Sequence, residues 1–309
     1  MKGIVLRGVL WVFTGVLAWA DSHLGPVTDL AVFNDQVYSC SQAGIFRGTG
    51  DDLTLLARPS IRVTSLSGLE DGVIYAGGQP GVAGSLGWLN PKTKQAGVIG
   101  KMGKDLVYGL AVLGDERFAV ARADGEVWIS QFTKREPLPS QLVHKHTAAA
   151  RAVAFSPDGK WFASVGLDGV IILSEIVERT FSKSRQLLDH TAGIECLVFS
   201  PDSKFLASGS LDSKVRLHEV TGKLVRSYNG LGMENEPVAG RVPSRILSLA
   251  WSDRLVAGTS KGSLYKLSLT DDTVDRLVRT GSDPIYALAF DSKGNLLLGT
   301  HGRLQVLPR

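Results

Sequence analysis

The sequence of 309 residues has little of several features that would name a class of protein. Its two cysteines, Cys40 and Cys196, are too few for a disulfide-rich framework or a four-cysteine zinc site. The 34 Lys and Arg against 30 Asp and Glu give a formal charge of +4, which is too balanced for a chain that mainly binds nucleic acid. Apolar residues make up 44% of the chain, so disorder is excluded as its main state.

Motifs of several catalytic and cofactor-binding classes are missing as well. The sequence has no G-x-S-x-G nucleophile motif and no G-x-x-x-x-G-K-[ST] phosphate loop. It has no C-x-x-C-H, which excludes a covalent c-type haem. His144 and His146 are close in sequence, but a zinc site would need further ligands. We therefore expect no catalytic residue, no metal site and no bound cofactor.

The first twenty residues contain no acidic residue and have the layout of a secretory signal peptide. Lys2 and Arg7 precede the uncharged, mostly apolar stretch Gly8–Leu17, and Ala18-Trp19-Ala20 is a typical cleavage signature. We predict cleavage after Ala20, which leaves residues 21–309 as one periplasmic or secreted domain with no membrane span. An uncleaved leader that anchors the domain to the inner membrane is the alternative, although the apolar run is short of the roughly 20 residues that span a bilayer.

The rest of the chain repeats one short apolar pattern seven times. The copies are VTDLAVF (27–33), VTSLSGL (63–69), VYGLAVL (107–113), AARAVAF (149–155), GIECLVF (193–199), RILSLAW (245–251) and PIYALAF (284–290). Each is followed by two further strand-like segments, and most by a third, with Gly, Asp and Ser turns between them. Such a repeat of about 40 residues is the signature of a β-propeller blade.

We therefore predict an all-β fold, a seven-bladed β-propeller. Only Asp21–Pro26 precede the first inner strand after cleavage, and six residues reach about 20 Å when fully extended. The chain also ends directly after the third strand of the last copy. We expect the last blade to be three-stranded or barely completed, and the ring to be held mainly by apolar packing between blades.

The fourth and fifth copies resemble WD repeats. The resemblance is carried by His146-Thr147, Phe155-Ser156-Pro157-Asp158-Gly159 and Asp168-Gly169, and by His190-Thr191, Phe199-Ser200-Pro201-Asp202 and Asp212. It implies a structural hydrogen-bond network in each blade. The network residues would be His146, Ser164 and Asp168, and His190, Ser208 and Asp212. The Trp-Asp pair of the family is absent: Ser174 and His218 stand at the Trp positions, and His218 is the better replacement as a hydrogen-bond donor.

Two insertions are candidates for a partner surface, because binding residues collect on loops of a rigid scaffold. One is the long connection Asn229–Ser244, with Glu234, Glu236 and Arg241; the other is Gly77–Gly84, with Gln79. Aligned positions early in the inner strands are Asp29, Ser65, Gly109, Arg151, Glu195, Leu247 and Tyr286. Of these, Arg151, Glu195 and Tyr286 are expected at the mouth of the central channel, although a slip of one residue would turn a side chain to the other face.

Two classes of function fit these observations. The first is a monomeric, non-catalytic, exported scaffold or accessory protein that binds protein partners and no nucleic acid. The resemblance implies a role of the kind that small exported propellers have beside periplasmic redox systems such as nitrate reductase. The alternative is a propeller enzyme or a cofactor or metal binder that uses the central channel, similar to a lactonase or a quinone-binding protein. Fold alone does not choose between them.

Overall fold

A computed structural model of the chain describes residues 25–49, 52–114, 117–133, 136–178, 180–229, 231 and 244–309. The predicted signal peptide lies outside the described residues. Within them the chain forms β-strands and turns and no α-helix, so no described helix is long and apolar enough to cross a membrane.

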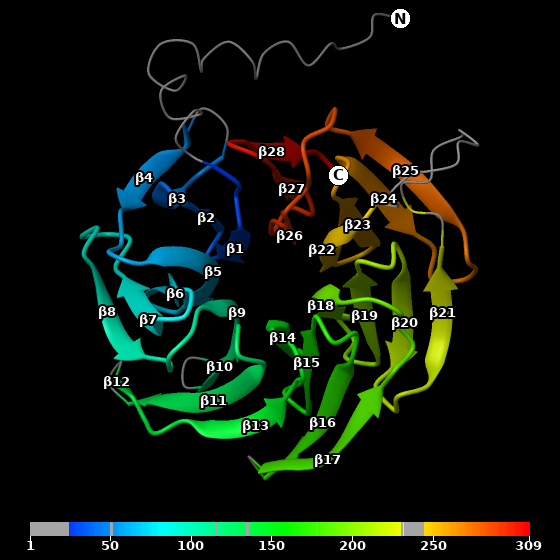
Figure 1. Cartoon of the computed structure of the whole chain (residues 1–309). Coiled ribbons are helices and arrows are strands. Elements are labelled where there is room, and N and C mark those ends of the chain that lie inside the picture. The colour runs from blue at the N-terminus through cyan, green and yellow to red at the C-terminus, as the bar shows by residue number, and fades with distance from the viewer. Residues whose placement is uncertain are drawn as a thin grey trace, which may run out of the picture.

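Seven antiparallel sheets follow one another along the chain and stand around a common axis (Figure 1). The first blade holds β1 (Asp29–Phe33), β2 (Gln36–Ser41), β3 (Gly44–Arg47) and β4 (Thr54–Ala57). The second holds β5 (Arg62–Leu69), β6 (Gly72–Gln79), β7 (Ala83–Leu89) and β8 (Ala96–Lys101). The third holds β9 (Val107–Leu113), β10 (Arg117–Arg122), β11 (Glu126–Thr133), β12 (Glu136–Pro137) and β13 (Gln141–Lys145).

The remaining blades repeat this plan. The fourth holds β14 (Ala150–Phe155), β15 (Trp161–Gly166), β16 (Ile171–Val177) and β17 (Thr180–Leu187). The fifth holds β18 (Ile194–Phe199), β19 (Phe205–Ser210), β20 (Val215–Glu219) and β21 (Leu224–Tyr228). The sixth holds β22 (Ile246–Trp251), β23 (Leu255–Thr259), β24 (Ser263–Leu267) and β25 (Val274–Arg279), and the seventh β26 (Ala287–Phe290), β27 (Leu296–Gly299) and β28 (Leu304–Leu307). The predicted seven-bladed propeller is thus confirmed, and its last sheet has three strands among the described residues.

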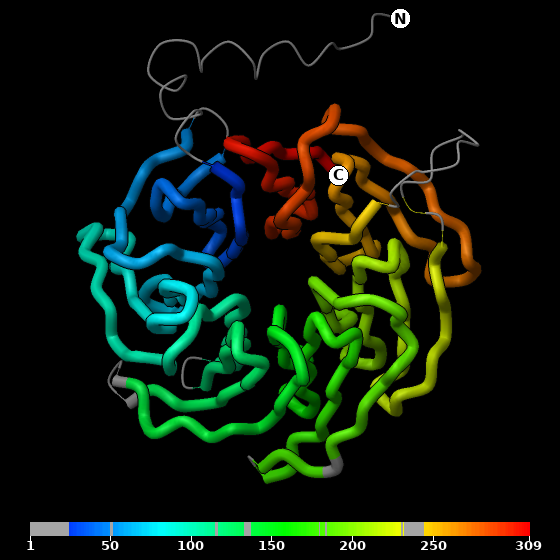
Figure 2. Tube along the Cα trace, viewed as in Figure 1, coloured from blue at the N-terminus to red at the C-terminus, as the bar shows by residue number. Residues whose placement is uncertain are grey.

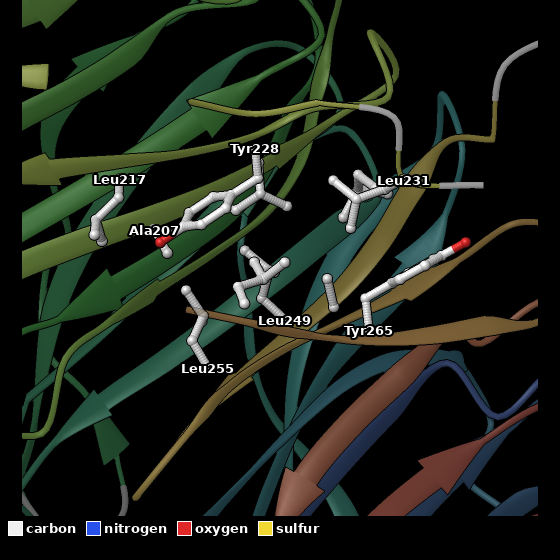
Figure 3. Packing of buried hydrophobic residues seen from close by; sticks show 11 residues of the cluster. Ala207, Leu217, Tyr228, Leu231, Leu249, Leu255 and Tyr265 are labelled. Carbon is white, nitrogen blue, oxygen red and sulfur yellow. The ribbon is translucent and has the colours of Figure 1, made fainter. Parts of the chain in front are cut away.

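Apolar side chains hold the blades together, because both faces of most sheets pack on a neighbouring blade. Between the fifth and sixth blades, Leu217 and Tyr228 lie against Leu249 and Leu255, with Leu231 at the edge of the cluster (Figure 3). The second strands are buried along nearly their whole length, which explains their continuous apolar sequences.

The ring closes where the start of the chain meets the turn between β27 and β28. Val27 N donates to Thr300 O at 3.0 Å, and Gly302 N donates to Gly25 O at 2.7 Å. The Val27 side chain lies in an apolar cluster with residues of β26, β27 and β28. The trace in Figure 2 shows the first and last blades as neighbours. Among the described residues, few backbone hydrogen bonds and one apolar cluster join these two blades.

The segment Gly77–Gly84 is not the loop that we expect from its glycines. β6 and β7 continue through it, with Gly77 opposite Ser85 and Gln79 opposite Ala83, so only the residues between the strands form a turn. A side chain at Gly77 would collide with the carbonyl oxygen of Arg62, since an added Cβ would lie 1.9 Å from it. The glycines therefore allow close approach of neighbouring strands. The segment extends the β6–β7 hairpin of the second blade and does not form a long loop.

Candidate functional site

One face of the ring brings together the features that the sequence singles out. Antiparallel order places the connections from each outer strand to the next inner strand on the same face as the turns between second and third strands. We call this the upper face. Hydrogen bonds tie the two sets together: His146 N donates to Gly125 O at 2.9 Å, and Thr280 N donates to Gly262 O at 2.7 Å. The opposite side, with the other turns, is the lower face.

In the fourth blade the predicted network residues form one hydrogen-bonded chain. His146 Nδ1 lies 3.1 Å from both carboxylate oxygens of Asp168, and its Nε2 lies 2.8 Å from Ser164 Oγ. The chain continues through His144 on β13, the outer strand of the third blade. Its Nδ1 lies 2.8 Å from Ser164 Oγ and its Nε2 lies 2.7 Å from Ser174 Oγ. Ser174 then meets Ser184 Oγ, at 2.7 Å, on the outer strand.

Asp168 fixes the direction of every hydrogen bond in this chain. It accepts from the backbone N–H groups of Thr147 and Val170, as an ionised carboxylate does, so His146 Nδ1 must donate to it. His146 Nε2 is then the acceptor for the Ser164 hydroxyl when the ring is neutral. Ser164 therefore accepts from His144 Nδ1, and His144 Nε2 accepts from Ser174. Both histidines carry their proton on Nδ1, and each polar atom of the chain has a partner.

Burial keeps these two histidines neutral. Desolvation, together with a smaller effect of the neighbouring His146, lowers the pKa of His144 from 6.5 to about 3. Desolvation also lowers the pKa of His146, although Asp168 opposes the shift. Since the hydroxyl partners of His144 can serve the neutral ring completely, nothing in the chain rewards its protonation.

The fifth blade links the equivalent residues differently. His190 Nδ1 lies 3.0 Å from Asp212 Oδ2, and its Nε2 lies 2.9 Å from Ser208 Oγ. Arg216, which is itself buried, donates to the same carboxylate oxygen of Asp212 at 2.8 Å. Burial alone would raise the pKa of Asp212, but the hydrogen bonds from His190 and Arg216 outweigh it and hold the pKa well below its usual value.

The two residues at the Trp positions do not behave alike. Ser174 joins its network through His144, a residue that the sequence pattern did not place in it. His218 is buried at the equivalent position, but its Nε2 meets Asp189 Oδ2 at 2.9 Å, and no hydrogen bond among the described residues joins it to Ser208. Burial lowers the pKa of His218, and Asp189 opposes the shift.

The third blade has a related group of ion pairs and hydrogen bonds that the sequence pattern did not indicate. Asp124 precedes Gly125 as Asp168 precedes Gly169, and it pairs with the buried side chain of Arg122. Arg122 also lies 3.0 Å from Glu126, which accepts from Trp128 Nε1 at 2.9 Å. The Asp124-Gly125 dipeptide was the sequence signal that could have indicated this group. Here Arg122 donates to the aspartate, whereas a histidine does so in the next blade.

A bulge interrupts the pairing near the start of five of the seven inner strands, at their upper end, and leaves one residue unpaired. Pairing skips one residue between Ala150 and Ala152, and again between Ile194 and Cys196, which isolates Arg151 and Glu195. The same position in the other blades is given by the pairing of each inner strand. We call the resulting set the bulge ring: Thr28, Thr64, Tyr108, Arg151, Glu195, Leu247 and Tyr286.

The alignment of inner strands was wrong by one residue in the first three blades. Ser65 and Gly109 follow the bulge instead of occupying it, and Asp29 pairs regularly within β1. Asp29 is partly buried, and it accepts from Ser65 Oγ at 2.6 Å and from Leu66 N at 2.9 Å. Desolvation raises its pKa, and these hydrogen bonds oppose the shift. Asp29 therefore ties the first two blades together inside the ring wall.

The two halves of the bulge ring differ in chemistry. Thr28 and Thr64 donate to backbone carbonyl oxygens of the following blade, Val63 O and Val107 O. By contrast, Arg151 Nε and Nη2 both approach Glu195 Oε2, at 2.7 and 2.6 Å, and the Arg151 guanidinium lies 4.1 Å from the centre of the Tyr108 ring. These side chains are partly exposed, and Nη1 of Arg151 and Oε1 of Glu195 have no partner among the described residues.

The other candidate residues are placed as follows. Gln79 is exposed at the end of the tall β6–β7 hairpin on the upper face, and Tyr286 is partly buried in the bulge ring. Glu234, Glu236 and Arg241 lie outside the described residues. Cys40 and Cys196 are free thiols in different blades. Within the described ranges, no three His, Cys, Asp or Glu side chains gather as a metal site would require.

Comparison with known families agrees with this geometry. The sequence model of the family described as WD domain, G-beta repeat matches residues 138–173 and 181–219. These stretches contain the histidines and aspartates of the fourth- and fifth-blade networks. The first match begins between β12 and β13 and ends in β16, and the second begins in β17 and ends with β20.

A solved structure supports the architecture of the whole chain. A chain of the structure described as "Crystal Structure of Mitotic Checkpoint Complex" aligns with a TM-score of 0.72 over 92% of this chain and 91% of that chain, with 15% sequence identity. This likeness concerns the fold. No curated protein matches the chain significantly.

Proposed function

We propose that the chain is an exported, non-catalytic scaffold whose upper face binds a protein partner. The observation that carries the proposal is the Arg151–Glu195–Tyr108 group, which spans three consecutive blades. Its charged atoms are partly exposed, and each of the two charged side chains has hydrogen-bonding capacity left for a partner. Propellers of the WD40 type generally mediate protein interactions, which agrees with this use.

Export is part of the proposal and is supported by the leader sequence. Cleavage after Ala20 would release a periplasmic or secreted monomer, and a retained leader would anchor the same propeller to the inner membrane. Service to a periplasmic redox system such as nitrate reductase is a finer form of the same proposal. Mass spectrometry of the protein from its native source distinguishes the cleaved form from the anchored form, because a mature chain starting at Asp21 rules out the anchor.

Crosslinking in the native compartment tests the scaffold. Wild-type protein is expected to give a crosslinked protein partner, and Arg151→Ala is expected to lose it. Lys293→Ala, which removes an exposed cation from the lower face, is the matched control and is expected to keep it. Equal crosslinking by both variants would exclude the Arg151 group as the contact. A stoichiometric metal or chromophore in the purified protein would instead favour the enzyme or cofactor-binding alternative.

A further inference from the structure

Among the described residues, the acidic side chains of the upper face are largely used inside the molecule. Asp105 accepts from the backbone N–H groups of Gly81 and Leu106, at 2.9 and 2.7 Å. The other described acids with side-chain partners within the chain are Asp124, Glu126, Asp168, Asp189, Glu195 and Asp212. Asp283 is the exception, since no bond of its carboxylate is found within the described residues. Most of the described negative charge of this face is therefore neutralised or already hydrogen-bonded.

Several cations of the same face are exposed and lack such partners. They stand in the connections between blades and beside the β27–β28 turn, and within the described ranges no acidic side chain pairs with them. These residues are Arg58, Arg62, Lys104, Arg245 and Arg303. Arg58 and Arg62 flank the connection between the first two blades, Lys104 lies in the next connection, Arg245 precedes the sixth blade and Arg303 lies in the seventh, so these cations do not form one continuous stripe.

The lower face mixes both signs of charge. Its turns contain the acids Asp35, Glu70, Asp71, Asp271 and Asp272, and also the exposed lysines Lys92, Lys160, Lys223 and Lys293. On the upper face, by contrast, most described acids are engaged within the chain and the five cations above pair with none of the described acids. Charges left unpaired in this way attract a partner of opposite charge before contact.

Apolar side chains on the upper face indicate the class of partner. Leu188 is 69% exposed and Val82 is 62% exposed, and both stand in upper-face connections or turns. Tyr108 and Tyr286 lie partly buried nearer the axis, in the bulge ring. Aromatic and apolar groups toward the centre with charges around them are the composition of a protein interface. A nucleic-acid surface would instead need a continuous basic track.

We propose, on the basis of the scaffold function above, that the partner is a protein with an acidic docking surface, and that its carboxylates meet the unpaired cations around the bulge ring. The Arg151–Glu195 pair then lies toward the centre of the contact. Because its two charges cancel, it fixes the position of the partner and adds little net attraction. Affinity falls with rising salt, because the rim charges remain accessible to ions.

Two variants with equal loss of charge test the proposal. The upper-face variant combines Arg58→Gln, Arg62→Gln, Lys104→Gln and Arg245→Gln. The lower-face control combines Lys92→Gln, Lys160→Gln, Lys223→Gln and Lys293→Gln, all at exposed positions. Each is measured by fluorescence anisotropy with a labelled peptide in which Glu alternates with Leu, and with the same peptide carrying Gln for Glu.

The acidic peptide is expected to bind wild type and the lower-face control, and to bind the upper-face variant about tenfold more weakly. The Gln peptide is expected to bind none of them measurably. Equal loss in both variants, or equal binding of both peptides, overturns the proposal. Duplex DNA and phosphatidylglycerol vesicles are tested in the same way. If either binds more tightly than the acidic peptide and depends equally on the upper-face cations, the partner is that anion and the proposal of an acidic protein is wrong.

The crosslinking experiment separates this proposal from the scaffold function. If wild type and the upper-face variant capture the same protein equally well, the scaffold stands and the acidic docking surface is wrong. If the acidic peptide depends on the upper face but wild type captures no protein, the charge complementarity stands and the scaffold function fails.

Discussion

The fourth and fifth blades have the same repeat motif but use it to build different interiors. In the network of the fourth blade, neutral side chains run from the Asp168 carboxylate to Ser184, with His144 between two serines. In the fifth blade Asp212 is shared by His190 and the buried Arg216, and His218 turns away to Asp189. The residue at the Trp position explains the difference. Ser174 is too short to reach Ser164, so His144 fills the gap, whereas His218 is long enough to find another partner.

The largest expected effect is in the ionic fifth blade. Asp212→Ala leaves the buried Arg216 guanidinium without its carboxylate, and breaking a buried ion pair in this way costs about 3–5 kcal/mol. Asp168→Ala should cost about 1–3 kcal/mol, because it strands only neutral donors. Urea unfolding of both variants at neutral pH measures the two free energies. Equal losses would show that the ionic and neutral blades are energetically the same.

Matched serine substitutions sharpen the comparison. Ser164 has two imidazole partners and Ser208 has one, so Ser164→Ala should cost about 2–3 kcal/mol and Ser208→Ala about 1 kcal/mol. The same unfolding experiment measures both, and the native fold is verified by circular dichroism. A larger loss for Ser208→Ala would contradict the hydrogen-bond chain described for the fourth blade.

Acidification should weaken the protein through the buried histidines. An unfolded His144 binds a proton below about pH 6.5, whereas the folded one stays neutral down to about 3, so stability falls as pH falls across that window. Each such histidine contributes about 1.4 kcal/mol per pH unit. His144→Asn should flatten the pH dependence of the unfolding free energy between about pH 6.5 and 5. His301→Asn, at an exposed position, is the control and should leave the slope unchanged.

The smallest effect is expected at the outer end of the fourth-blade chain. Ser184 is exposed, and water can replace its hydroxyl beside Ser174. Ser184→Ala should therefore change the unfolding free energy by less than about 0.5 kcal/mol. A loss as large as that of Ser164→Ala would mean that water does not reach the chain at this point.

Most of the fold was predictable because blade strands have a repeated apolar pattern that packing between blades demands. The seven inner strands and the three-stranded last sheet follow from copies such as Val107–Leu113 and from the end of the last copy. The tall second-blade hairpin was not predictable from its glycines. Gly77 suggests a turn when taken alone, and only the carbonyl oxygen of Arg62 beside it shows why glycine is needed.

The candidate site was predictable only in part, for a related reason. His146 and His190 stand at repeat positions and were singled out, whereas His144 acts through a neighbour on another strand, Ser174, that the pattern does not couple to it. Bulges explain the misplacement of Ser65 and Gly109, since one extra residue shifts the alternation of side chains along the strand by one position. The position of Arg151 was found, but its stacking on Tyr108 was not, because the two residues come from adjacent blades.

The unequal bulge ring has a geometric consequence. Seven blades around an axis give nearly sevenfold symmetry, and a symmetric ring would accept a partner in seven equivalent rotational settings. Threonines that are bonded to the next blade occupy two adjacent positions, and a tyrosine, an arginine and a glutamate occupy the following three. The ring therefore has a marked direction around its axis, so that a partner that contacts Arg151 is fixed in rotation as well as in position.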